Sequence, residues 1–105
     1  HEVRTDPRVL AIRIDENLVF SNVRYLEHRI YALVAQKPGL RHVLLIASGI
    51  NLIDASGLRF LEVCAETLAL GKVELHLAEV KGPVMDQLAR AGFPARLGRE
   101  RFHLS

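Results

Sequence analysis

The chain combines short apolar segments with longer amphipathic ones in a regular order. Residues 42–47 (HVLLIA) show no alternation, which is typical of a parallel strand covered on both faces. Residues 73–78 (VELHLA) alternate apolar and polar positions, which predicts a strand with one less buried face. Together with two further apolar segments, they make up the predicted strands: residues 9–14, 42–47, 73–78 and 101–104.

Three segments between these strands repeat their apolar residues at helical spacing. They predict helices over residues 21–35, about 55–70, and from 82 to the stop at Gly92. Ser21 can cap the first helix, with Phe20 and Tyr25 as a hydrophobic staple. Gly71 is placed to be the C′ residue of the second helix, and Pro83 suits the first turn of the third.

Strands and helices therefore alternate along the chain, which predicts an α/β fold. Alternation of this kind is typical of a mostly parallel central sheet, here of four or five strands, joined by right-handed crossover helices. The 105 residues are enough for one hydrophobic core, and the pattern contains no internal repeat or linker. We expect residues 1–105 to form a single domain.

Composition and charge exclude several classes of protein. The 14 basic and 12 acidic side chains are scattered, without the basic stripe of a nucleic-acid-binding protein. Cys64 is the only cysteine, so an intrachain disulfide and a cysteine-rich zinc site are excluded, and a reducing cytoplasmic setting fits. The longest strictly apolar run, residues 43–47, is too short to span a bilayer.

Enzyme and metal-site motifs are missing from the sequence. The link after the first strand has no glycine for a dinucleotide fingerprint, and Gly71-Lys72 leads into a strand rather than into a P-loop helix. We interpret the five histidines as lying far apart, on different elements and without metal-ligand spacing. We therefore predict no catalytic residue, no metal site and no obligatory cofactor, and we interpret Cys64 as a packing residue.

The start of the second helix, Asp54-Ala55-Ser56-Gly57, has two interpretations. Asp54 is a good N-cap, and Gly57 would let neighbouring backbone or a partner approach closely. Ser56 would place its hydroxyl beside the free amides of the first turn, where a phosphoryl group is favoured. The same amides could hold an anion or a nucleotide phosphate, with Ser48 and Asn51 nearby.

The segment IDASGL, between a strand and an amphipathic helix, resembles the STAS domain. This domain is shared by bacterial anti-sigma-factor antagonists and by the C-terminal tails of SulP anion transporters. The antagonists have an Asp-Ser-Ser-Gly motif whose second serine is phosphorylated, and that serine falls on Ser56. The chain departs from the motif at Ala55, which leaves the phosphoacceptor position in place.

Two longer segments are similar to the transporter branch of this family. Residues 16–30 resemble a Glu-x-Leu-x-Phe-x-Asn pattern leading into the first helix. Residues 77–93 resemble, nearly residue for residue, a Val-Lys-Gly-Pro-Val-x-Asp-x-Leu-x-x-Ala-Gly pattern. The resemblance implies a non-catalytic regulatory tail on the cytoplasmic side of the membrane. Its implied partners are the transmembrane part of the parent transporter, a cytosolic protein or a second copy.

The resemblance and the chain ends lead to further expectations. His1 in place of methionine, and an end directly after an apolar segment, predict a domain excised from a longer transporter and lacking its final helix. Two alternatives stay open. One is a free-standing anti-sigma-factor antagonist switched by phosphorylation of Ser56, and the other is a nucleotide-binding STAS module.

Overall fold

The computed structural model describes residues 6–105, so the interpretation of His1 concerns a residue outside the described part. The order of elements confirms the predicted alternation, with one additional short helix and a 3-10 turn near the end. The elements are β1 (Val9–Arg13), α1 (Phe20–Ala35), β2 (His42–Ile46), α2 (Ala55–Leu70), β3 (Glu74–Ala78), α3 (Gly82–Arg90), α4 (Phe93–Leu97), η1 (Arg99–Arg101) and β4 (Phe102–His103).

The described strands form one parallel sheet of four strands in the order β1-β2-β3-β4. Each strand pairs with the next one along the chain, so each crossover places the following strand directly beside the previous one. The α/β class and the mostly parallel sheet are therefore confirmed. In such a sheet the loops that follow the strands gather at one edge, and the start of α2 belongs to this edge.

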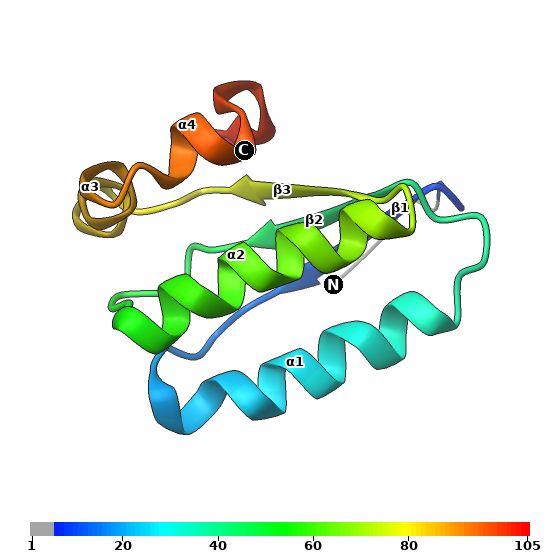
Figure 1. Cartoon of the computed structure of the whole chain (residues 1–105), viewed down its shortest axis with the longest axis horizontal. Helices are drawn as coiled ribbons and strands as arrows, with labels where there is room; N and C mark the ends of the chain where they lie inside the picture. The colour runs from blue at the N-terminus through cyan, green and yellow to red at the C-terminus, as the bar shows by residue number, and fades with distance from the viewer. Residues whose placement is uncertain (1–5) are drawn as a thin grey trace.

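The hydrophobic core lies on one face of the sheet. Figure 1 shows α1 and α2 side by side on this face, and buried residues of all four α-helices belong to the same core cluster. The strand positions at the centre of the cluster are paired in register across the sheet. They are Ile12, Val43, Leu45, Leu75 and Leu77.

The other face of the sheet is only partly covered, which corrects the prediction for residues 42–47. Val43 and Leu45 are buried, whereas Leu44 and Ile46, which point to the opposite face, are half-buried. The apolar run alone does not predict this difference in burial, because side-chain periodicity does not show which face of the sheet the helices cover. The predicted alternation in β3 is confirmed, with Leu75 buried and Glu74 exposed.

The backbone at the C-terminal ends of α2 and α3 differs in detail from the prediction. Gly71 occupies the C-cap of α2 with φ −93°, and the left-handed conformation falls one residue later, on Lys72 with φ 63°. Gly92 ends α3 as predicted, but its left-handed backbone also begins α4, because Pro94 fits the first turn of a helix. The part of the chain that the structure describes contains no helix long and apolar enough to cross a membrane.

Candidate functional site

The segments that precede α1 and α2 are paired with each other. Leu18 forms an isolated parallel bridge with Ile53. The backbone amide of Leu18 donates to the Leu52 carbonyl at 3.0 Å, and the amide of Asp54 donates to the Leu18 carbonyl at 3.1 Å. These bonds hold the N-termini of the two helices next to each other at one end of the domain (Figure 1).

The Asp54 carboxylate caps both of these helices. Its Oδ1 accepts from the backbone amide of Gly57 at 2.8 Å, and its Oδ2 accepts from the amide of Phe20 at 2.9 Å. These two bonds hold the pKa of Asp54 below its ordinary value because they stabilise the ionised form, and the bond from Phe20 has the larger effect. The predicted cap on α2 is confirmed, and the same side chain also serves α1.

The prediction that Ser21 caps α1 is wrong. The helix begins at Phe20, its N-cap position is Val19, and Ser21 lies inside the first turn. Phe20 and Tyr25 are 78% and 60% exposed, so they do not form the predicted buried staple. The physical reason is that Asp54, 34 residues after Phe20, supplies the acceptor that a local serine would otherwise provide.

Gly57 is required by close packing of the chain on itself. A Cβ added at this position would lie 1.9 Å from the carbonyl oxygen of Leu18 and 2.7 Å from its Cβ. Leu18 is buried and held on both sides by backbone hydrogen bonds, so it has no room to move. The sequence indicated either crowding or an approaching partner at Gly57, and the neighbour is the backbone of Leu18.

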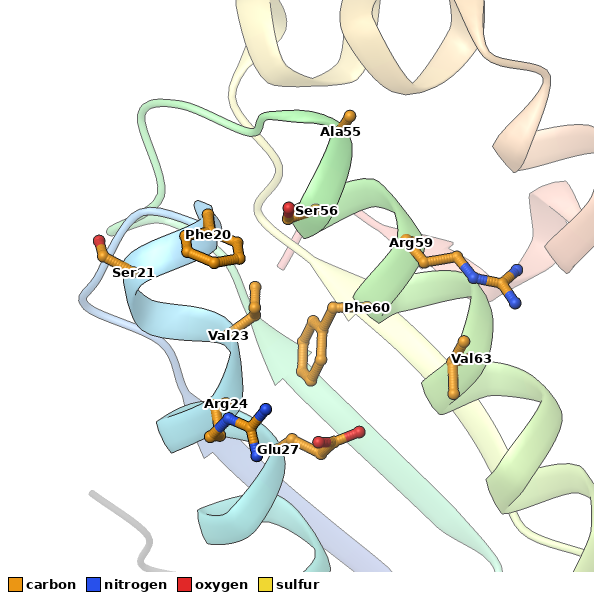
Figure 2. A pocket seen from close by; sticks show the side chains of 10 residues that line it. All are labelled: Phe20, Ser21, Val23, Arg24, Glu27, Ala55, Ser56, Arg59, Phe60 and Val63. Carbon is orange, nitrogen blue, oxygen red and sulfur yellow. The ribbon is translucent and has the colours of Figure 1, made fainter.

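Ser56 is half-buried and lines an open groove of about 710 Å³ between α1 and α2. Figure 2 shows its side chain on the side of α2 that faces α1, close to the ring of Phe20, with Phe60 further along the groove. The groove is mainly apolar and has charged side chains at its border. Its lining residues are Phe20, Ser21, Val23, Arg24, Glu27, Ala55, Ser56, Arg59, Phe60 and Val63.

The loop residues Ser48 and Asn51 are held separately from Ser56. The side-chain oxygen of Asn17 accepts from the amides of Asn51 and Leu52 at 2.9 and 3.2 Å. The Asn51 side chain accepts from the Lys81 ammonium group, which directs it toward the start of α3. Ser48 is a half-buried turn residue. The structure therefore joins Asp54, Ser56 and Gly57 in one helix start, while Asn51 belongs to a neighbouring polar network.

The sequence pattern does not predict the apolar part of the groove. The pattern places Phe20 in a local staple, whereas the ring is exposed and lines the groove. A usable signal is that Phe20 lies off the helix face that carries the core residues Leu26 and Ile30.

Cys64 is fully buried as a packing residue, and burial raises the pKa of its thiol to about 11, which opposes formation of the reactive thiolate.

The positions of three histidines also differ from the prediction. His42, His76 and His103 lie on three neighbouring strands, and their ring nitrogens approach one another. The distance is 3.2 Å between His42 Nδ1 and His76 Nε2, and 3.0 Å between His76 Nδ1 and His103 Nε2. The inference that they are far apart is wrong because separation in sequence does not measure separation across a parallel sheet.

The double cap predicts how Asp54 affects stability. Asp54→Ala lowers the melting temperature of the chain by about 5 °C at pH 7, because two helix N-termini lose their acceptor. The folded chain lowers the pKa of Asp54, so its contribution is present above the unfolded pKa and is lost as the pH falls through the folded pKa. Thermal unfolding followed by circular dichroism between pH 2 and pH 7 measures the difference from the unaltered chain.

That difference in melting temperature shrinks below about pH 4, where the unfolded carboxyl group begins to be protonated. Asp86→Ala is the matched control, since Asp86 is exposed on α3. A difference that persists unchanged at pH 2 would contradict the assignment of Asp54 as an ionised double cap.

The crowding at Gly57 predicts a large effect of one methyl group. Gly57→Ala lowers the free energy of unfolding by about 3 kcal/mol, because the new Cβ must displace the Leu18 backbone. Urea denaturation measures the change. Gly82→Ala is the control, because a Cβ at Gly82 meets nothing within 4 Å. Equal stability of the two variants would show that Leu18 can move away from α2.

Comparisons with known proteins identify the family of the chain. The family model for the STAS domain matches residues 1–104. Sulfate transporter 1.3 of Arabidopsis thaliana is 29% identical, in an alignment covering 94% of this chain and 16% of the transporter. The chain thus spans less than one fifth of the length of that relative.

Solved structures share the fold at low sequence identity. A sulfate transporter family protein from Wolinella succinogenes gives a TM-score of 0.83 at 24% identity, over 97% of this chain and 80% of that one. The SulP transporter STAS domain from Vibrio cholerae gives 0.78 at 12% identity, over 96% and 77%. The chain belongs to the STAS domain family and resembles the STAS domains of SulP sulfate transporters.

Proposed function

We propose that this chain is the regulatory domain of a SulP-type transporter for sulfate or a related anion, and that it lies on the cytoplasmic side of the membrane. The observation that carries the proposal is the similarity of nearly the whole chain to one part of a sulfate transporter. Membership of the STAS family supports it. In this arrangement the transmembrane part of the parent transporter binds and carries the anion, and the domain acts on it through protein contacts.

The chemistry at the start of α2 supports a role in binding rather than in catalysis. Both oxygens of the Asp54 carboxylate accept backbone amides, and these bonds stabilise the ionised form, which makes the group a weak base for proton transfer. The amides of Asn51 and Leu52 likewise donate to Asn17. A nucleotide phosphate at this loop would have to replace these acceptors, so the geometry favours protein contact over phosphate binding here.

The groove between α1 and α2 is the surface that we assign to this contact. Phe20 is 78% exposed at its border, next to the apolar side chains of Val23, Phe60 and Val63. An exposed aromatic ring beside an apolar groove is typical of an anchor in a protein interface. We infer that the groove receives the transmembrane part of the parent transporter.

This contact predicts a transport defect from a surface change. Phe20→Ser in the intact transporter lowers sulfate uptake by about threefold or more, because an exposed anchor is lost while the core of the domain is untouched. Leu70→Ser is the matched control, since Leu70 is 87% exposed at the other end of α2. Uptake is measured with labelled sulfate at equal amounts of transporter in the membrane.

Two results would overturn different parts of the proposal. If Phe20→Ser and Leu70→Ser transport equally well, the groove is not the contact surface. If the native reading frame that contains this chain encodes no set of apolar segments of about 20 residues, the transporter assignment fails.

The second candidate function is a free-standing anti-sigma-factor antagonist switched at Ser56. One observation favours it: the Ser56 side chain lines the groove, where a phosphoryl group would alter the surface that a partner meets. The neighbouring Asp54 carboxylate would repel this group, so modification would weaken the cap that holds α1 against α2.

This candidate predicts that Ser56 carries phosphate under some growth conditions of the host. Mass spectrometry of the chain isolated from its own host detects the modification. Ser21, on the opposite wall of the same groove, is the internal control for unspecific phosphorylation. A Ser56 that is unmodified under every growth condition contradicts the switch and leaves the transporter proposal unaffected.

A further inference from the structure

The partly covered face of the sheet brings together three polar side chains from two neighbouring strands. His42 begins β2 and is the register partner of Glu74, which begins β3. His76 follows two residues after Glu74 and therefore points to the same face. Within the described residues these three side chains form a group in which one ligand atom of each lies within 4.8 Å of the others.

The three ligand atoms form a nearly equilateral triangle. His42 Nδ1 lies 3.2 Å from His76 Nε2, and Glu74 Oε1 lies 3.4 Å from each of these nitrogens. Ligands at about 2.0–2.1 Å from a tetrahedral zinc ion are separated by about 3.3–3.4 Å. In an octahedral magnesium site with the same bond lengths the separation is about 2.9 Å. The triangle therefore fits one face of a tetrahedral site.

Neighbouring side chains hold two of the ligands in the required orientation. His76 Nδ1 lies 3.0 Å from His103 Nε2 on β4, so a proton on Nδ1 leaves the lone pair of Nε2 free for a metal. The Arg101 guanidinium lies 3.6 Å from Glu74 Oε2, which leaves Oε1 facing the histidines.

We propose that His42, Glu74 and His76 bind one divalent cation of the zinc class, with a fourth position open to solvent. Two imidazoles and one carboxylate are the donors that such a cation prefers, whereas magnesium and calcium require more oxygen ligands. The ion links the first residues of β2 and β3 on the partly covered face of the sheet. His103 acts as the outer partner that orients His76.

The proposal predicts one Zn²⁺ per chain. The 105-residue chain is first treated with a chelator. Calorimetric titration with zinc chloride, in a buffer that does not bind metals, then measures the stoichiometry and affinity. His42→Gln, Glu74→Gln and His76→Gln each weaken binding by more than about tenfold, because each removes one ligand. His103→Gln weakens it by about tenfold through loss of the outer partner.

His28→Gln is the matched control, because His28 is exposed on α1 and belongs to another surface. Unchanged zinc binding in either His42→Gln or His76→Gln would overturn the proposal. So would a titration of the unaltered chain that shows no binding at millimolar zinc.

A second measurement needs no substitution and therefore does not depend on the folding of variants. Zn²⁺ is added to the unaltered chain, and the histidine ring protons are followed by NMR. The metal shifts the signals of His42 and His76 and leaves that of His28 in place. Zinc shifts confined to His28, or equal shifts at all histidines, contradict the site. Transport and the groove beside Ser56 are not involved, so the outcome is independent of the proposed function.

Discussion

The pairing of the segments before α1 and α2 is the contact on which the rest of this domain depends. Gly57 lets the backbone of Leu18 approach α2 more closely than any side chain would permit. Asp54 then bonds to the first turns of both helices. Because the unpaired amides of two helix N-termini share one carboxylate, the helices start at the same place and run side by side over the sheet.

This constraint also determines the groove. Phe20 lies in the first turn of α1, is 78% exposed, and lines the groove together with Phe60. Ser56 is then held at the wall of the groove by the same first turn that Asp54 caps. The surface proposed for protein contact and the serine proposed for modification therefore depend on one local arrangement of backbone and carboxylate.

Much of this arrangement was readable from local pattern. The strands, the three longer helices and the cap at Asp54 follow from side-chain periodicity and from the preference of carboxylates for free amides. The local pattern misleads where a distant residue takes the place of a local one. Ser21 was a suitable cap for α1, but Asp54 reaches the helix from another element. Gly92 and Pro94 stop one helix and begin another, and the sequence shows only the stop.

The sequence by itself determined the element order, the parallel α/β class, the single core and the family resemblance, because these depend on periodicity and on contiguous motifs. Only the tertiary structure decided which face of the sheet the helices cover and which neighbour Gly57 accommodates. It alone placed one ligand atom each of His42, Glu74 and His76 within 4.8 Å of the others. The physical reason is that strand register brings together residues more than 30 positions apart, and no local pattern records that register.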